Sequence, residues 1–159
     1  MNMNMLGAFA AVGLLAACAS TPPETAAATG SGSAAAPVGP APGSQEDLAR
    51  NVGDRVFYEF DRAVLQSDAR ATLDRQASWL RQYAANNVQV AGNCDERGTE
   101  EYNIALGQRR ANAARDYLVA AGVAGSRITT ISFGKDRPSA LGSDEESWAK
   151  NRNAITSVQ

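Results

Sequence analysis

The segment from Gly92 to Arg110 most constrains how this chain can fold, because three kinds of local structure follow one another within it. The residues before Gly92 are typical of a strand, and the charged residues after it are typical of a turn. Gly98 in that turn can adopt the positive φ that a sharp reversal needs. Thr99 is expected to cap a helix, because acidic residues follow it where the helix dipole favours negative charge. The segment therefore predicts a strand, a turn and a long helix in direct succession.

The periodicity of the predicted helix determines which of its side chains face the turn. At about 100° per residue, Asn103, Leu106 and Arg110 lie along one edge of the apolar face, whereas Arg109 points away from it. We therefore expect Arg110 to be directed towards the turn that contains Asp95, and Arg109 to lie in solvent. The predicted apolar face consists of Ile104, Ala111, Ala114, Leu118 and Ala121.

Two interpretations fit this charged turn. A charged turn before a helix is often only a solvated cap, and Asp95 with Arg110 could form a structural ion pair. Alternatively, the two side chains are a receptor for a zwitterion, in which the carboxylate binds an ammonium and the guanidinium binds a carboxylate bidentately. The Gly98 turn and the helix N-terminus would add backbone N–H donors for a second anionic group. These residues alone leave both interpretations open.

The same segment, GNCDERGTEEYNIALGQRRA, resembles the signature of the OmpA-like peptidoglycan-binding domains. The resemblance extends from about Val56 to Ala154, and it includes FYEFDRAVL near its start and GKDRPSALGSDEESWAKNR near its end. It implies an α/β sandwich of βαβαβ type with an added C-terminal strand. It also implies non-covalent binding of the diaminopimelate in the peptidoglycan stem peptide.

The resemblance further implies a set of ligand-binding residues. Asp95 would bind the ammonium of diaminopimelate, and Arg110 would bind the carboxylate at the same end of its side chain. The remaining residues expected at the site are Phe60, Asp61, Arg97, Gly98, Thr99, Asn103 and Leu106.

The sequence departs from the family pattern at two positions in the domain and at its N-terminus. Asn93 stands where relatives often carry histidine, beside the expected pocket. Asn153 follows Arg152 where relatives commonly carry a second arginine. Residues 1–5 contain neither lysine nor arginine, although signal peptides usually begin with a positive charge.

The N-terminal third of the chain predicts export and attachment rather than a folded core. Residues 6–17 form an apolar run that is too short to span a bilayer, so residues 1–17 are expected to be a signal peptide. Cys18 directly after Leu-Ala-Ala resembles a bacterial lipobox, which implies acylation at Cys18. Ala19 and Ser20 follow in place of an aspartate, and this implies sorting to the outer membrane. The Ala-, Pro-, Gly- and Ser-rich residues that continue to residue 46 are expected to be a disordered tether.

Residues 47–159 are expected to form one small α/β domain in which strands alternate with helices. The first predicted strand directs Val56, Tyr58 and Phe60 to one face and Phe57 to the other. The following helix is expected to bury Leu73, Ala77, Leu80 and Ala84. In chain order, the predicted elements are a strand at 55–60, a helix from 67 or 68, a strand at 88–92, a helix at 99–121 that ends before Gly122, a strand at 128–133, a helix from 143 or 144, and a strand at 154–158.

Composition argues against catalysis and against cofactor binding. The chain has no histidine, which excludes Ser-His and Cys-His nucleophiles and most zinc sites. Cys94 is expected to be a small residue that ends the second strand. Adjacent residues on one turn, such as Asp95 and Glu96, rarely face each other across a sugar as a glycosidase pair does. The net charge of −2 gives no attraction to nucleic acid. The rival interpretation as an enzyme acting on peptidoglycan therefore receives no support.

A second rival interpretation is a pure protein-interaction module. Surface residues of the loop 134–147 could serve a partner. The resemblance implies that this partner is a periplasmic β-propeller protein of the Tol system. The resemblance makes the two roles compatible, because family members use overlapping surfaces for the cell wall and the propeller protein. The sequence therefore predicts an outer-membrane lipoprotein with its domain in the periplasm, bound to peptidoglycan and to Tol components without a cofactor or a metal.

Overall fold

The computed structural model describes residues 39–159 of the chain. The predicted signal peptide, the lipidation site Cys18 and the part of the predicted tether before residue 39 lie outside the described residues. Within the described part of the chain, no helix has the length and apolar character needed to cross a membrane.

The sheet has four strands, which are β1 (Arg55–Phe57), β2 (Val88–Asn93), β3 (Ile128–Gly134) and β4 (Asn153–Val158). Their order is β1-β4-β2-β3. The last strand lies between the first two and runs antiparallel to both, whereas β2 and β3 are parallel. A parallel pair needs a crossover connection, and a long helix supplies it here. The predicted βαβαβ fold with an added C-terminal strand is therefore confirmed.

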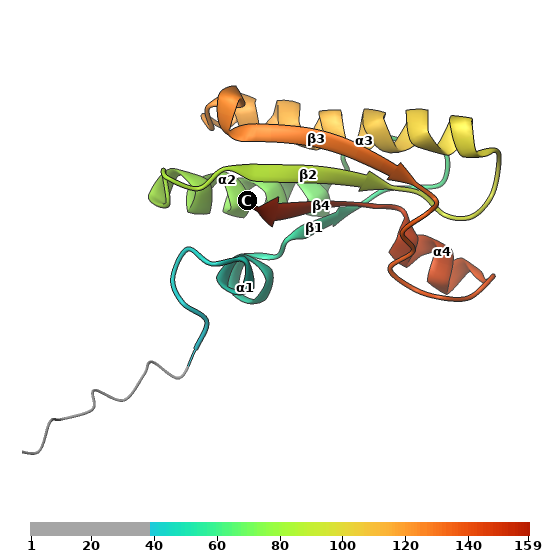
Figure 1. Ribbon diagram of the computed structural model, residues 1–159, viewed down its shortest axis with the longest axis horizontal. Coiled ribbons are helices and arrows are strands. Elements are labelled where there is room, and N and C mark those ends of the chain that lie inside the picture. Colours follow the sequence, from blue (N-terminus) through green and yellow to red (C-terminus); the bar gives the residue numbers. More distant parts are fainter. Residues whose placement is uncertain (1–38) are drawn as a thin grey trace, which may run out of the picture. The chain divides into compact units, whose positions relative to one another are not determined.

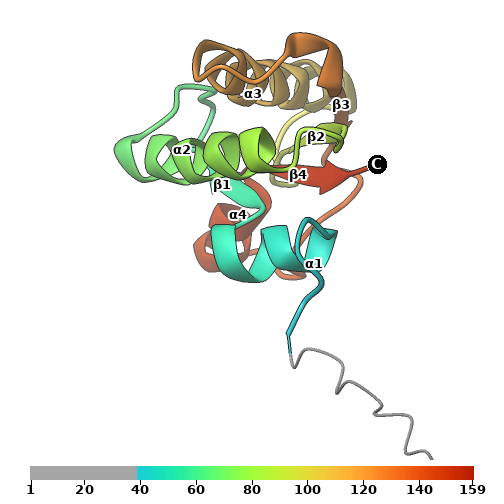
Figure 2. The ribbon, with the colours of Figure 1, turned by 90° about the vertical axis from the view of Figure 1, so that its left-hand side faces the viewer.

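Two long helices, α2 (Ser67–Gln82) and α3 (Glu100–Ala120), cover one face of this sheet (Figures 1 and 2). The short helix α4 (Glu145–Asn151) lies at the end of the sheet where β3 leads into β4 (Figure 1). A single helical turn, α1 (Gln45–Asp47), continues as a π-helical turn over Leu48–Val52.

The hydrophobic core lies between the two long helices and the sheet. The helical spacing of Leu73, Ala77 and Leu80 predicted their burial, and all three are buried. Ala84 was also predicted to be in the core, but α2 ends at Gln82 and Ala84 is exposed. The residues with no exposed surface in the core are Leu48, Leu73, Leu80, Val88, Val90, Ala111 and Leu118.

The predicted ends of α3 are confirmed by its capping geometry. Thr99 accepts a hydrogen bond from the backbone N–H of Tyr102 at 3.3 Å, and Gly98 has a φ of +90°. Gly122, with a φ of +94°, follows the last turn of the helix. The expected burial of Ile104 is wrong, because this side chain is 38% exposed beside the end of β3.

The first strand is shorter than its sequence pattern predicted. Val56 and Tyr58 are buried and Phe57 is half-exposed, as expected, but Phe60 is 56% exposed. The strand ends at Phe57, and Asp61 adopts a positive φ of +56°, which turns the chain away from the sheet. Phe60 therefore lies in a loop and not on the core face.

The folded region begins before the predicted boundary at residue 47. The side chain of Asn86 donates to the Gly43 carbonyl at 2.7 Å, and the Gly43 N–H donates to Asp47 Oδ2 at 2.9 Å. Asp47 also accepts a hydrogen bond from the indole N–H of Trp79 at 2.9 Å. The last residues of the predicted tether, from Gly43 onwards, therefore pack on the domain.

Helix α3 approaches β2 closely because both elements carry glycine at the crossing point. A Cβ added to Gly92 would clash with the carbonyl oxygen of Gly107 and lie 2.6 Å from its carbonyl carbon. A Cβ at Gly107 would lie 2.8 Å from the Gly92 carbonyl oxygen. This contact sets the position of the helix whose first half forms one wall of the site.

Candidate ligand-binding pocket

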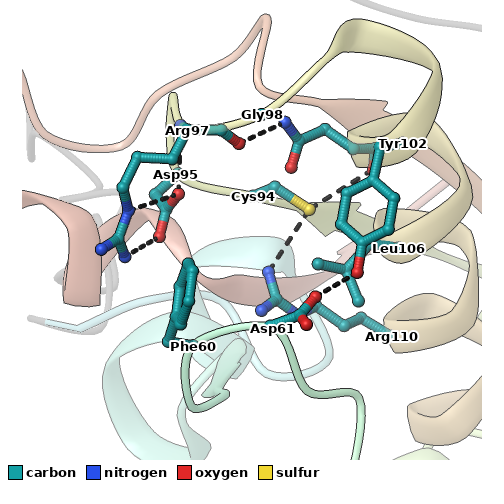
Figure 3. Close-up of a pocket in the computed structure, with 10 residues that line it drawn as sticks. Phe60, Asp61, Cys94, Asp95, Arg97, Gly98, Tyr102, Leu106 and Arg110 are labelled. Carbon is teal, nitrogen blue, oxygen red and sulfur yellow. Dashed lines mark hydrogen bonds and ion pairs between the residues drawn. The ribbon is translucent and has the colours of Figure 1, made fainter.

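A cavity of about 200 Å³ lies between the turn that follows β2, the first half of α3 and the loop that follows β1 (Figure 3). The structure brings together every predicted site residue except Thr99, which caps α3 beside the cavity. Cys94 and Tyr102 also line the cavity and were not predicted. The lining residues are Phe60, Asp61, Cys94, Asp95, Arg97, Gly98, Tyr102, Asn103, Leu106 and Arg110.

The guanidinium of Arg110 is buried and is held by backbone carbonyl groups. Its side chain is 1% exposed, and it donates to the carbonyl oxygens of Arg62 and Asn93 at 2.8 Å and of Glu59 at 3.1 Å. Burial lowers the pKa of Arg110. Arg109 is exposed, so the predicted helix phase is confirmed. The Arg110 side chain ties the loop after β1 to the end of β2.

Arg110 forms no ion pair with Asp95 among residues 39–159, so the interpretation of these two residues as a structural ion pair is wrong. Its Nη1 reaches Asn93 O and the thiol of Cys94, the latter at 3.4 Å. Its Nη2 carries two N–H groups, and only the bond to Glu59 uses one of them within the described part of the chain. The other N–H of Nη2 has no hydrogen-bond partner among the described residues, and Arg110 lines the cavity.

Asp95 is instead surrounded by two other arginines. Arg97 contacts it through Nη2 at 2.6 Å and Nε at 3.2 Å, and Arg152 contacts it through Nη1 at 3.3 Å. Burial alone would raise the pKa of Asp95, but the hydrogen bonds from Arg97 and Arg152 outweigh it and lower this pKa from its ordinary 3.8. The carboxylate is therefore ionised throughout the neutral and mildly acidic range.

This lowered pKa predicts a pH-dependent contribution of Asp95 to stability. A carboxyl whose folded-state pKa lies below its unfolded value stabilises the fold above the unfolded value, and this contribution disappears as the pH falls through the folded value. We expect the wild type to be more stable than Asp95→Asn at pH 7, and the difference to shrink below the ordinary value of 3.8. Urea denaturation of both proteins at several pH values measures it. A stability difference between the two proteins that does not change with pH would contradict the lowered pKa of Asp95.

Arg152 is a site residue that the sequence analysis did not assign. Its side chain is 8% exposed, and it joins Asp95 to Glu145 of α4, with Nη2 2.6 Å from the Glu145 carboxylate. Its Nε donates to the Tyr58 carbonyl at 3.2 Å. The only signal in the sequence was its position at the end of the segment GKDRPSALGSDEESWAKNR.

The side of the pocket away from Arg97 is formed by Tyr102 and Leu106 of α3 (Figure 3). The hydroxyl of Tyr102 donates to Asp61 Oδ1, and this hydrogen bond raises the pKa of Tyr102. Asp61 is the only described non-glycine residue with a positive φ. Backbone strain of this kind is often found at binding sites. The contact holds the loop after β1 against α3 at the mouth of the pocket.

The thiol of Cys94 lies within the wall of the pocket. It is buried between Arg110 and the Asn103 carbonyl, at 3.4 Å from each. Burial raises its pKa, so the sulfur stays a protonated thiol at neutral pH. A protonated, buried thiol is a poor nucleophile. No cluster of three or more potential metal ligands occurs within residues 39–159.

The two departures from the family pattern lie against each other. Asn93 Nδ2 donates to Asn153 Oδ1 at 2.8 Å, and both side chains are buried. Asn153 also donates to the Lys150 carbonyl at 2.7 Å and to Ser139 Oγ at 3.0 Å. The Oδ1 of Asn93 has no hydrogen-bond partner in the described region. The two positions therefore form one uncharged, buried pair.

The fold and the pocket define a class of protein, a two-layer α/β domain with a charged pocket beside the turn that follows β2. Residues 57–152 match the OmpA family, and the chain belongs to that family.

Relatives within this family are similar to this chain along most of their length. The chain is 51% identical to the peptidoglycan-associated lipoprotein of Rhizobium meliloti (strain 1021) over 144 residues, which cover 89% of this chain and 80% of the relative. It is 50% identical to the peptidoglycan-associated lipoprotein of Mesorhizobium japonicum over 145 residues, which cover 91% of this chain and 84% of the relative.

Solved structures are similar over the folded domain. The crystal structure of the peptidoglycan-associated lipoprotein from Burkholderia pseudomallei has a TM-score of 0.65 and 42% sequence identity, and the match covers 67% of this chain and 90% of that one. The C-terminal domain of Helicobacter pylori MotB shares the fold alone, with a TM-score of 0.62 and 19% identity over 67% of this chain and 84% of that one.

Proposed function

We propose that this protein is an outer-membrane lipoprotein whose folded domain binds peptidoglycan non-covalently and catalyses no reaction. The names of its relatives support peptidoglycan as the ligand. The structural observation that most supports this proposal is that a buried carboxylate, Asp95, and a buried guanidinium, Arg110, line the same cavity without pairing with each other. A pocket with two separated, opposite charges suits a zwitterionic ligand.

The ligand group that fits this arrangement is the side-chain end of diaminopimelate in the stem peptide. It carries an ammonium and a carboxylate on one carbon, and methylene groups join them to the peptide. Asp95 binds the ammonium, and the remaining Nη2 hydrogen of Arg110 binds the carboxylate. Phe60 and Leu106 contact the methylene groups, while Asn103 holds the turn by donating to the Arg97 carbonyl at 2.8 Å.

We propose further that the domain is attached to the outer membrane through acylated Cys18 and a tether. Several acyl chains make this attachment durable, because a single chain holds only marginally. The domain serves envelope integrity and cell division in the Tol system, whose periplasmic propeller protein contacts the segment 134–147. Leu141 in that segment is 90% exposed and offers an apolar contact.

Sedimentation with purified sacculi tests the proposed ligand. We expect the domain to sediment with sacculi of the diaminopimelate type, and a free diaminopimelate-containing muropeptide to release it. Asp95→Ala should remain in the supernatant. If the wild-type domain does not sediment, or if muropeptide fails to compete, the proposed function is wrong. A suspension of sacculi that clears on addition of the domain would instead indicate an enzyme.

A further inference from the structure

We propose that Arg97 is an internal competitor of the ligand: its guanidinium occupies the ammonium position at Asp95 and has to leave before a ligand binds. The inference rests on the proposed function, because it concerns the same pocket. Arg97 therefore acts as a gate, which is closed while its guanidinium pairs with Asp95 and open once it has left. The sequence had instead predicted that Arg97 contacts the ligand.

The hydrogen-bonding capacity of Asp95 is already used. Its two oxygens accept four hydrogen bonds, from the backbone N–H, Nε and Nη2 of Arg97 and from Nη1 of Arg152. A carboxylate offers about four acceptor positions. An incoming ammonium therefore has to replace one of the two arginine side chains.

Of the two arginines at Asp95, Arg97 is the one that can leave. Its side chain is 32% exposed, whereas that of Arg152 is 8% exposed. Arg152 is also bound to the Tyr58 carbonyl and to Glu145 at 2.6 Å, but the contact between Arg97 and Glu145 is loose, at 3.9 Å. Arg97 can move into solvent and leave Asp95 paired with Arg152.

The position that the Arg97 guanidinium occupies suits a cation. The guanidinium lies between two aromatic rings, 4.0 Å from the centroid of Phe60 and 4.1 Å from that of Trp148. The Trp148 ring is positioned by a hydrogen bond of 3.0 Å from its indole N–H to Glu96. Two aromatic faces beside a carboxylate bind an ammonium by cation–π attraction and charge. Arg97 thus stands in for the ammonium of the ligand.

With a competitor inside the chain, the apparent affinity equals the intrinsic affinity multiplied by the fraction of time for which the site is free. If Arg97 is engaged for about nine-tenths of the time, the apparent Kd is about tenfold higher than the intrinsic Kd. Arg97→Met removes the guanidinium and keeps an unbranched side chain that cannot pair with Asp95. We therefore expect Arg97→Met to bind a diaminopimelate muropeptide about three- to tenfold more tightly than the wild type.

Calorimetric titration of this muropeptide into the wild type, Arg97→Met and Arg137→Met tests the gate. Arg137 is a matched control, because its guanidinium also stacks on an aromatic ring, Phe133 at 3.7 Å, but does not line the pocket. We expect Arg137→Met to bind as the wild type does. Equal or weaker binding by Arg97→Met than by the wild type would overturn the gate and leave the proposed function standing.

Trp148 supplies a second readout. Displacement of Arg97 changes the surroundings of the indole, so we expect the muropeptide to change the tryptophan fluorescence of the wild type. This change should be absent in Trp148→Phe and smaller in Arg97→Met, in which no guanidinium has to leave. An equal change in the wild type and Arg97→Met would count against displacement. If neither the wild type nor Arg97→Met binds the muropeptide, the proposed function fails together with the gate.

Discussion

We expect Gly92→Ala to lower the free energy of unfolding by more than about 3 kcal/mol, at the upper end of what overpacking costs. The new methyl group would overlap the Gly107 carbonyl and lie 3.2 Å from the backbone nitrogen of Ala111. These are backbone atoms of α3, and they cannot move aside as a flexible side chain can. The helix has to retreat from β2, which opens the core between them.

Urea denaturation followed by far-ultraviolet circular dichroism measures this loss. Gly125→Ala is the matched control, because a Cβ at Gly125 would meet its nearest neighbours at 3.5 Å, an ordinary contact distance. We expect that control to stay within about 0.5 kcal/mol of the wild type. If Gly92→Ala were as stable as Gly125→Ala, the inference that α3 packs too closely on β2 to admit a methyl group would be wrong.

The second large effect concerns Arg110→Met and the choice between two stem peptides. Diaminopimelate and lysine differ at the side-chain end by one carboxylate, and a hydrogen bond to a charged group contributes about 1.5–3 kcal/mol. We expect the wild type to prefer the diaminopimelate peptide by about ten- to a hundredfold. Arg110→Met should abolish this preference, because it removes the group that binds the extra carboxylate.

The structure adds a stability cost to this variant. Without the guanidinium, the carbonyl groups of Glu59, Arg62 and Asn93 lose their donor, and we expect a loss of about 1–3 kcal/mol. The loop that carries Phe60 is then held less firmly, so binding of the lysine peptide should also weaken slightly. The ratio of the two affinities, and not the loss for either ligand, is therefore the decisive quantity.

Calorimetric titration of both peptides into the wild type, Arg110→Met and Arg109→Met provides this ratio. Arg109 precedes Arg110 on the same helix and is exposed, so Arg109→Met should leave both affinities unchanged. Equal losses from the two variants would contradict a role specific to Arg110. Equal affinity of the wild type for both peptides would contradict carboxylate recognition by the pocket.

The sequence by itself determined the features that depend on neighbouring residues. Gly98 is the residue that tolerates a positive φ, Thr99 has the side-chain oxygen of an N-cap, and the helical period separates Arg110 from Arg109. Each of these follows from interactions within a few residues along the chain. The turn, the start of α3 and the orientation of Arg110 could therefore be predicted without tertiary structure.

Only the tertiary structure decided which charges meet. Asp95 pairs with Arg152, 57 residues away, and Arg110 binds the Glu59 carbonyl, 51 residues away. The strand pattern that included Phe60 failed because the chain turns at Asp61, where α3 and its Tyr102 hydroxyl hold the loop. Hydrophobic periodicity reports which face of an element is buried, but it contains no information about partners brought together by the crossing of distant elements. The pairing of Asp95 with Arg152, and the rings of Phe60 and Trp148 beside the Arg97 guanidinium, depend on that crossing.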